Sequence, residues 1–375
     1  MVSLLHIISG LSTGGAEQAL YNLLAGGLAD RFKNYVISLC DEGTMGPRFQ
    51  KLGIPVVALH VNTGKVPFGG LLKLLRLTKE ISPVILQGWM YHGNLAATVT
   101  RQLSTGILGL AWNIRHSLYD LEHEKLVTRQ VIRMNRLFSS GPEALLYNSR
   151  LSRKQHEVFG FAAQKGCVIP NGINLEKFSF SMESRENVRL ELNIPLNAVV
   201  IGHVARLHPM KDHAIFLRAA STIARNYPEV HFLMSGRNIT IENDMMAELI
   251  PLPSVTRFHL VGERNDVPDL MSAMDIFCLS SWSEGFPNVL GEAMATSRPC
   301  ITTDAGDSAL LLGDTGVVVP PRDEEALTAG IESLLLMSCR ERSVLGRLAR
   351  CRVEEHYPLE KIVEQYAAVY DKMLS

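Results

Sequence analysis

The chain has 375 residues, of which 46% are hydrophobic and 20% are charged, and its formal net charge at pH 7 is −1. This composition is typical of a folded globular protein and excludes a disordered chain, while the length predicts two domains of about 150 to 200 residues each. The opening MVSLLHIISGL lacks the basic segment of a signal peptide, and no apolar run approaches the ~18 residues that span a membrane. We therefore expect a cytoplasmic protein.

The charge is divided unevenly along the chain. Residues 1–180 carry 19 Lys and Arg against 11 Asp and Glu, a net charge of +8. The remaining residues carry 18 Lys and Arg against 27 Asp and Glu, a net charge of −9. Such an asymmetry indicates that the two halves meet different partners.

Apolar runs of strand length alternate with helical patterns in both halves. In the first half the predicted strands are Ser3 to Ile8, Tyr35 to Leu39, Val56 to Leu59, Pro83 to Leu86 and Leu108 to Trp112. In the second half they are Val199 to Val204, Val230 to Met234, Arg257 to Leu260, Asp275 to Leu279, Pro299 to Thr302 and Val317 to Val319. Such alternation predicts two doubly wound parallel sheets, joined by the polar stretch 171–186.

The first predicted strand leads into SGLSTGGAEQAL, where Gly14 and Gly15 precede a helix expected to begin near Ala16. Without a β-carbon the backbone can approach a bound group closely, and a helix N-terminus favours an anion. The G-x-G-x-x-G pattern of dinucleotide sites is absent. The two glycines therefore indicate either an anion site or a tight strand-to-helix turn.

Two predicted helices of the first half carry basic residues at helical spacing, in GGLLKLLRLTKE and EKLVTRQVIRMNRLF. The basic residues are Lys73, Arg76, Lys79, Lys125, Arg129, Arg133 and Arg136. Because apolar residues share these helices, an anionic membrane surface is one interpretation of the basic faces. A solvated face opposite a core stripe is the other. The basic faces lack the interleaved aromatic residues of a nucleic-acid site, so we expect no nucleic-acid partner.

A histidine follows the last predicted strand of the first half, in WNIRHS. His116 lies at the carboxyl end of that strand, where open parallel sheets bind ligands. An imidazole there can hold a sugar hydroxyl or a phosphate oxygen. A purely structural histidine is the alternative, as we expect for His6, His203 and His231 inside strands.

Arg206 and Lys211 follow the first strand of the second half, in GHVARLHPMKDHAIF. Two fixed cations at the ligand-binding end of a sheet suit a diphosphate leaving group, because its charge grows as the bond to the sugar breaks. Solvated loop charges are the alternative interpretation.

The segment SEGFPNVLGEAMAT, residues 283–296, says most about function. It follows a predicted strand and contains a helix, with Pro287 expected at the first helical position and the helix running from Asn288 to Ala295. Gly285 lets the backbone approach a ligand, and the helix N-terminus favours phosphate. Glu284 and Glu292 beside such a site would be repelled unless they accept hydrogen bonds from sugar hydroxyls. The segment predicts a site for a sugar phosphate or a nucleotide sugar.

The sequence shows no metal or disulfide pattern. Asp304 and Asp307 are too few ligands for a metal, and no DxD motif or His/Cys/carboxylate cluster occurs at ligand spacing. The cysteines have no C-x-x-C spacing, so we expect buried free thiols at Cys40, Cys167, Cys278, Cys300, Cys339 and Cys351.

Together these segments resemble family 4 of the retaining glycosyltransferases. The matching stretches, in the expected order over almost the whole chain, are STGGAEQAL, NIRHS, VIPNGIN, ARLHPMKD, SEGFPNVLGEAMA and the C-terminal amphipathic helix. The resemblance implies an α/β fold of GT-B architecture, with two Rossmann-like doubly wound parallel-sheet domains facing a cleft. It predicts an acceptor-side domain at 1–178, a nucleotide-sugar-binding domain at 179–356 and a C-terminal helix at 357–375 that packs back on the first domain.

The resemblance also implies roles for the candidate residues. Arg206 and Lys211 would bind the donor diphosphate, Glu284 would contact the transferred sugar, and Glu292 would bind the ribose hydroxyls. The remaining donor contacts would come from the loop at Gly285, from the N–H groups of Phe286, Asn288 and Val289, from Gly14 and Gly15, which would close on the diphosphate, and from His116, which would touch the sugar.

The implied reaction moves a sugar, with retention, from a nucleotide-sugar donor to a saccharide or lipid-linked acceptor in the synthesis of a cell-envelope or surface polysaccharide. The leaving phosphate helps to deprotonate the acceptor, so no separate protein base is needed. No cofactor or metal is expected. Such an enzyme would be cytoplasmic and peripheral at the inner face of the membrane.

The chain departs from the family pattern at several positions. The glycine usual before the arginine is Ala205, the glycine usual after the lysine is Asp212, and TTDAGDSALLL lacks the common G-G-x-x-E. Two other functions remain open: a GT-B nucleotide-sugar epimerase or hydrolase, which needs no acceptor, and a non-catalytic sugar-binding module, which binds without turnover.

Overall fold

The computed structural model describes residues 1–12, 14–61, 68–118, 121 and 125–375. The chain forms two compact units, the first made of Met1–Gly172 with Leu359–Ser375 and the second of Ile173–Pro358. These boundaries lie near the expected ones at 178/179 and 356/357. Each unit is built around its own parallel sheet, as the alternating pattern predicts.

In the first unit the described residues form a seven-stranded parallel sheet with the order β3-β2-β1-β4-β5-β6-β7. The strands are β1 (Ser3–Ile8), β2 (Lys33–Ser38), β3 (Val56–Ala58), β4 (Ile85–Trp89), β5 (Gly109–Ile114), β6 (Ala144–Tyr147) and β7 (Gly166–Val168). The sequence patterns predict the first five of these and miss β6 and β7. The missed strands have the sequences ALLY and GCV, in which alanine and glycine replace the β-branched residues that indicate a strand.

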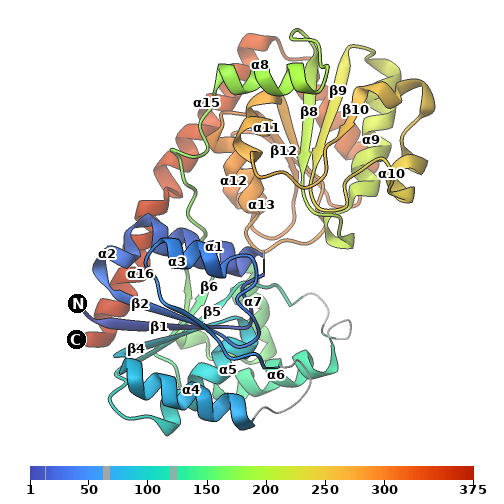
Figure 1. The fold of residues 1–375 in the computed structure, drawn as a ribbon. Helices are drawn as coiled ribbons and strands as arrows, with labels where there is room; N and C mark the ends of the chain where they lie inside the picture. The colour runs from blue at the N-terminus through green and yellow to red at the C-terminus, as the bar shows by residue number, and fades with distance from the viewer. Residues whose placement is uncertain (13, 62–67, 119–120, 122–124) are drawn as a thin grey trace. The chain divides into compact units, whose positions relative to one another are not determined.

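Helices cover both faces of this sheet, because its strands point apolar side chains alternately to either side. In β1, Leu4 and Ile8 pack toward α1 and α16, whereas Leu5 and Ile7 pack toward α4, α5 and α6. Figure 1 shows the two helical layers. The helices are α1 (Gly15–Leu23), η1 (Leu24–Leu28), α2 (Ala29–Arg31), α3 (Gly46–Lys51), α4 (Phe68–Ile81), α5 (Met90–Leu103), α6 (Leu126–Phe138), α7 (Arg150–Phe159), η3 (Ala163–Lys165) and α16 (Leu359–Leu374).

The C-terminal helix α16 is part of the core of the first unit. Ile362, Tyr366 and Tyr370 are almost fully buried, and the Tyr370 ring meets Phe32 edge-on with ring centroids 5.4 Å apart. Burying each such side chain stabilises the unit by roughly 1.5 to 3 kcal/mol. The apolar face of the final helix, which the sequence leaves without a partner, is therefore covered by the first unit.

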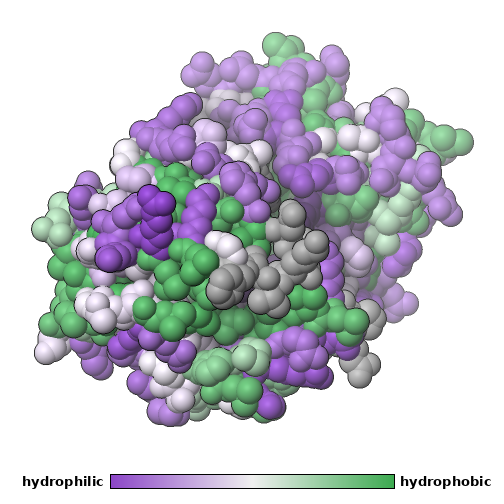
Figure 2. Space-filling view, turned by 60° about the horizontal axis from the view of Figure 1, so that its bottom comes forward, coloured by the Kyte–Doolittle hydropathy of each residue, from purple (hydrophilic) through white to green (hydrophobic). Residues whose placement is uncertain are grey.

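The outer face of α6 exposes apolar and basic side chains together. Leu126, Val127, Met134 and Leu137 are 70%, 52%, 40% and 65% exposed. Figure 2 looks onto the α4 to α6 side of this unit, where green and purple side chains lie next to one another. Among the described residues no helix is both long and apolar enough to cross a membrane.

In the second unit the described residues form a six-stranded parallel sheet with the order β10-β9-β8-β11-β12-β13. The strands are β8 (Val199–Val204), β9 (Val230–Ser235), β10 (Phe258–Leu260), β11 (Ile276–Leu279), β12 (Cys300–Thr303) and β13 (Val317–Val319). All six agree with the predicted runs to within one residue at each end. Since the chain builds outward from β8 to β10 and then restarts at β11, the sheet changes direction between β8 and β11.

Two layers of helices cover this second sheet (Figure 1). One layer contains α8 (Met182–Glu191), α11 (Val267–Ala273), α12 (Asn288–Ala295), α13 (Ser308–Leu312) and α15 (Cys339–His356). The other contains α9 (His213–Asn226), α10 (Asp244–Leu249), η5 (Leu252–Arg257) and α14 (Glu324–Leu335), and η4 (Pro209–Lys211) precedes α9.

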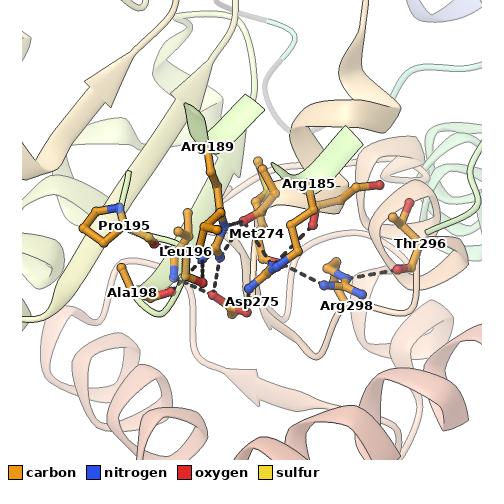
Figure 3. A network of polar contacts seen from close by, with 12 residues as sticks. Arg185, Arg189, Pro195, Leu196, Ala198, Met274, Asp275, Thr296 and Arg298 are labelled. Atoms are coloured by element: carbon orange, nitrogen blue, oxygen red, sulfur yellow. Dashed lines mark hydrogen bonds and ion pairs between the residues drawn. The ribbon is translucent and has the colours of Figure 1, made fainter. Parts of the chain in front are cut away.

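Three arginines converge at the amino end of β11 (Figure 3). Arg185 and Arg189 each donate to a different oxygen of Asp275 at 2.7 Å, and Arg189 is fully buried. Arg298 donates to the Met274 carbonyl at 2.8 Å, and burial lowers its pKa to about 10. Asp275 also accepts from the Val200 N–H at 2.8 Å, so one carboxylate ties α8 to β8 and β11.

The cysteines differ in part from the expectation of buried thiols. All six are free, and Cys278 and Cys300 are buried. The prediction is wrong for Cys339 and Cys351, which are exposed, because α15 turns these two positions to solvent.

Candidate functional site

The candidate residues of the second unit gather where its sheet changes direction. Arg206 and Lys211 follow β8, and Glu284 follows β11, and these two strands pair directly through Ile201 with Ile276. The carboxyl ends of parallel strands at such a switch point form the ligand-binding edge of an open sheet. The sheet order therefore brings together residues that lie more than 70 positions apart in the sequence.

The loop after β8 ends in a tight turn that leads into α9. The ring of His208 accepts a hydrogen bond from the Met210 N–H at 3.2 Å, which starts the short helix η4. Asp212 then adopts a left-handed conformation, with φ 48° and ψ 52°, and its carboxylate caps α9 at Ile215 N.

Arg206 is exposed, and no carboxylate among the described residues forms an ion pair with it. Its guanidinium is thus available to an anion.

Lys211 and Glu284 form an ion pair with each other, with 2.5 Å between Nζ and Oε1. The Glu284 side chain is only 9% exposed and that of Lys211 is 23% exposed. The hydroxyl of Ser281 also donates to Glu284 Oε1, at 2.7 Å. The family resemblance implies that these two residues bind different parts of a donor, and the structure shows in addition that they contact one another.

Helix α12 starts directly after the Glu284 loop. Its bounds, Asn288–Ala295, agree with the prediction, but Pro287 is the N-cap residue and not the first helical residue. The correction follows from its ψ of 91°, which is extended. The positive end of the helix dipole lies beside Gly285 and Phe286, and the first amide groups of a helix lack intrahelical acceptors. This end of α12 favours an anion.

The side chains of Phe286 and Val289 belong to the core. Phe286 is 7% exposed and packs on Tyr357, with ring centroids 5.5 Å apart, and Val289 packs against the same cluster. Only the backbone groups of these residues are suited to a ligand.

Glu292 lies in the second turn of α12 and is partly buried. Burial raises its pKa to about 7, and the charge of Lys177 offsets only part of this effect. At neutral pH the carboxyl group therefore exists both protonated and ionised. Such a group can accept a hydrogen bond from one hydroxyl and donate to another.

The loop after β12 packs against the backbone of the loop that carries Glu284. A β-carbon at Gly306 would lie 2.4 Å from the Glu284 carbonyl oxygen, and the φ of Gly306 is +62°, so only glycine fits this close approach. The Asp307 N–H donates to the Gly285 carbonyl at 3.0 Å. Sequence reasoning missed Gly306 and Ser281, because a single glycine or serine has no signal until the fold places it against the loop.

In the first unit, Gly14 and Gly15 lie where α1 begins. Gly14 is the N-cap residue with extended backbone, and a β-carbon there would lie 2.5 Å from Glu17 Oε2. A β-carbon at Gly15 would meet no atom within 4 Å, so the space beside it is open. Thr13 of the same motif lies outside the described residues.

His116 follows β5, as predicted, and is held through its backbone. The Ser152 hydroxyl donates to its carbonyl at 2.7 Å, and its ring meets Tyr91 edge-on with centroids 6.5 Å apart. The Tyr91 hydroxyl in turn contacts His156 Nε2 at 2.8 Å. Sequence reasoning missed Ser152 and Tyr91, which lie on α7 and α5. Gly14, Gly15 and His116 belong to the first unit, whereas Lys211 and Glu284 belong to the second.

No group of three or more His, Cys, Asp or Glu side chains suited to a metal ion occurs among the described residues. The expectation that the site needs no metal stays a prediction.

Parts of this chain are similar to a known family model and to named proteins. Residues 198–336 match the family model described as "Glycosyl transferases group 1". The UDP-Gal:alpha-D-GlcNAc-diphosphoundecaprenol alpha-1,3-galactosyltransferase of Escherichia coli is 26% identical over 214 residues, which are 56% of this chain and 55% of that protein. The D-inositol 3-phosphate glycosyltransferase of Corynebacterium urealyticum is 30% identical over 180 residues, 45% of this chain and 42% of that protein. The chain thus spans about half the length of these relatives.

The fold as a whole matches solved structures. The crystal structure of Anabaena Alr3699/HepE in complex with UDP-glucose superposes with a TM-score of 0.84 at 21% identity, covering 99% of this chain and 100% of that chain. The predicted GT-B architecture is confirmed. The solved structures show the likeness of fold, and the likeness in sequence to glycosyltransferases includes the match over residues 198–336.

Proposed function

We propose that the chain is a retaining glycosyltransferase that moves a sugar from a nucleotide-sugar donor to a saccharide or lipid-linked acceptor in the synthesis of a cell-envelope or surface polysaccharide. The observation that carries the proposal is the Lys211 and Glu284 pair at the switch point of the second sheet, next to the N-terminus of α12. The names of the E. coli relative and of the Anabaena complex, which refer to UDP-sugars and to a diphosphoundecaprenol acceptor, support the donor and acceptor classes.

In this proposal the cations neutralise the donor diphosphate. The Lys211 ammonium has three donors, of which Glu284 uses one, so two are left for phosphate oxygens. Arg206 adds a second charge, and the N-terminus of α12 adds backbone donors at Phe286, Asn288 and Val289. Charge that develops on the leaving diphosphate would meet groups already in place, which is how preorganised sites lower a barrier.

The carboxylates bind hydroxyl groups of the donor. Glu284 Oε1 accepts from Lys211 and Ser281, and in this proposal the carboxylate also accepts from a hydroxyl of the transferred sugar. Glu292, with its raised pKa, would pair with the two ribose hydroxyls. In the first unit, the backbone at Gly14 and Gly15 would contact the diphosphate, and His116 would contact the sugar.

Transfer then follows on one face of the sugar. The bond from the anomeric carbon to the diphosphate oxygen breaks, the acceptor oxygen attacks from the same face, and a phosphate oxygen takes the acceptor proton. No separate protein base or metal is needed if Arg206, Lys211 and α12 balance the charge. An epimerase, a hydrolase or a non-catalytic sugar-binding module is not favoured, because the similar proteins are named as glycosyltransferases.

We also propose that the enzyme is cytoplasmic and binds peripherally to an anionic membrane surface through the outer face of α6. Lys125, Arg129, Arg133 and Arg136 line one side of this face, and Leu126, Val127, Met134 and Leu137 line the adjacent side, while α6 contains no acidic residue. A helix with apolar and basic sides next to one another binds a membrane surface by burying the first and pairing the second with lipid phosphates. A lipid-linked acceptor would be met at such a surface.

A donor screen by thermal unfolding tests the nucleotide-sugar proposal. A donor at ~100 times its dissociation constant stabilises the folded protein by roughly 2.7 kcal/mol. We expect a clear rise of the midpoint with at least one nucleotide sugar and with its free nucleoside diphosphate, and no rise with the sugar alone. A protein that no nucleotide or nucleotide sugar stabilises would speak against a donor site.

A further inference from the structure

The turn that carries Lys211 is strained. Asp212, which follows it, adopts the left-handed region that a side chain disfavours and glycine adopts without cost. The Asp212 carboxylate accepts from Ile215 N at 3.4 Å and caps α9, and the Asp212 carbonyl accepts from Phe216 N at 3.3 Å. A left-handed residue other than glycine still costs free energy, which further contacts of the turn must offset.

That support comes from the end of β11. The Ser280 hydroxyl lies 2.9 Å from the Lys211 carbonyl oxygen and 3.2 Å from that of Asp212, and the Ser280 side chain is fully buried. A hydroxyl carries one proton, which these two carbonyls share, and its lone pairs are left to accept. Ser280 thus holds the backbone on both sides of the strained position.

Trp282, two residues after Ser280, also holds carbonyl groups of this turn. Its N–H donates to the Met210 carbonyl at 3.0 Å, and its indole Nε1 donates to the Pro209 carbonyl at 2.9 Å. The four consecutive carbonyl groups of residues 209–212 are each held by Ser280 or Trp282. Glu284, the partner of Lys211, lies two residues further along the same loop.

His203 completes the contacts of Ser280. Its Nε2 lies 3.1 Å from the Ser280 oxygen, and the ring is 1% exposed. Because the Ser280 proton is directed at carbonyl oxygens, Nε2 must carry the ring proton and donate. Burial, with the charges of His213 and Lys211, lowers the pKa of His203 well below its usual range, so the ring is neutral. The hydrogen bond from His203 thus helps to fix the orientation of the Ser280 hydroxyl.

We propose that Ser280 is a positioning residue for donor binding. It holds Lys211 in a strained turn, so that the ammonium group meets Glu284 and the donor diphosphate at the same point, and it does not touch the donor itself. This inference rests on the proposed donor site. Preorganisation of this kind raises affinity because the ordering of the turn is completed before the ligand binds.

The test combines Ser280→Ala with Asp212→Gly in the full-length protein. UDP, GDP and ADP are titrated calorimetrically into the wild type, and the tightest of them is used for all variants. We expect Ser280→Ala to weaken binding at least fivefold. Asp212→Gly removes the strain, so alone it should change affinity less than twofold, and in the double variant it should restore affinity to within twofold of the wild type. Ser272→Ala is the matched control, because Ser272 is a buried serine on α11 whose hydroxyl also donates to a carbonyl. It should bind like the wild type.

Ser280→Ala binding as tightly as the wild type would overturn the inference, and so would a double variant no better than Ser280→Ala. If Ser280→Ala does not fold, the comparison is made in the Asp212→Gly background, where a fivefold loss on removing Ser280 would contradict the proposal. A wild type that unfolds cooperatively but binds none of the three nucleotides would remove the proposed donor site and this inference with it. Binding by the wild type with unchanged Ser280→Ala would remove the inference alone.

Discussion

Lys211 and Glu284 form an ion pair that is largely shielded from water. With the carboxylate 9% exposed, most of the water that would solvate its charge is excluded, and the ammonium group with the Ser281 hydroxyl replaces it. A charge-assisted contact of 2.5 Å fixes both side chains relative to one another. The site therefore depends on an ion pair whose loss also affects stability.

Removing one member of this pair should cost more than removing both. We expect Lys211→Met to lower the free energy of unfolding by about 2 to 3 kcal/mol, because it leaves a buried carboxylate without its cation. The double variant Lys211→Met with Glu284→Gln should recover most of this loss, as measured by urea unfolding. The exposed pair of Arg218 and Glu324 is the control, since its loss should cost less than about 1 kcal/mol. Equal losses at the two pairs, or additive effects at the first, would contradict this account.

Glu292 makes stability depend on pH. Its pKa is raised to about 7 in the folded protein, so the stability it contributes is complete below the ordinary pKa of a glutamate and is lost as the pH rises through 7. We expect Glu292→Gln to be more stable than the wild type at pH 8 by up to roughly 3 kcal/mol, and equal to it at pH 4. Urea unfolding at the two pH values checks this. A difference that is the same at both would show that Glu292 does not titrate in this range.

At the scale of elements, the strand and helix positions of the second unit follow closely from sequence pattern. Its strands are short apolar runs separated by turn residues, and α12 runs over Asn288–Ala295 as predicted, although Pro287 is its N-cap and not its first residue. In the first unit the same approach misses β6 and β7, whose sequences are ALLY and GCV. Alanine and glycine are depleted in strands, whereas the short strands that were predicted, such as VVV in β13, are rich in β-branched or aromatic residues.

The candidate site was predictable only in part, for a related reason. Charged residues such as Arg206, Lys211 and Glu284 are predicted as site residues from their charge and from their position after a predicted strand. Ser280 and Gly306 have no signal in the sequence, because their roles depend on which carbonyl groups the sheet brings beside them. The contact between Lys211 and Glu284 was equally hidden, since it follows from the pairing of β8 with β11.

The arginine network at the opposite end of β11 offers a test of how α8 is held. Asp275 is the only carboxylate among the described residues shown to pair with Arg185 and Arg189. We expect Asp275→Asn to lower the free energy of unfolding by about 3 to 5 kcal/mol, because it leaves buried guanidinium groups without an anion. Glu263→Gln, which breaks an exposed pair with Arg237, should cost less than about 1 kcal/mol in the same urea titration. If both substitutions lowered the free energy of unfolding by a similarly small amount, Asp275 would not stabilise the fold through its ion pairs with Arg185 and Arg189.

At the scale of the whole molecule, the two halves carry opposite net charges of +8 and −9. An anionic membrane would attract the first half and repel the second, and the exposed apolar residues of α6 lie in the first. The charge distribution thus favours the proposed membrane binding through the first unit, which would bring that unit to a lipid-linked acceptor.

Vesicle co-sedimentation measures this directly. We expect binding to vesicles with 30% or so anionic lipid, little binding to zwitterionic vesicles, and a steep loss between low and ~0.5 M salt. Arg133→Glu with Leu137→Ser should reduce binding about tenfold or more. Leu252→Ser is the matched control, because Leu252 is an 85% exposed leucine of the second unit. Binding that ignores both salt and lipid charge, or that the α6 variant retains, would contradict a membrane role for this face.

The most direct test of the central claim is a transfer reaction followed by NMR. The donor that stabilises the protein most is incubated with the purified enzyme and with a panel of saccharide and diphospholipid-linked acceptors, and both the released nucleotide and the anomeric configuration of the product are measured. We predict release of one nucleoside diphosphate for each sugar transferred, with the anomeric configuration of the donor kept in the product, and loss of turnover in Glu284→Ala. Release of no nucleotide with any pair, an inverted product, or full activity of Glu284→Ala would contradict it.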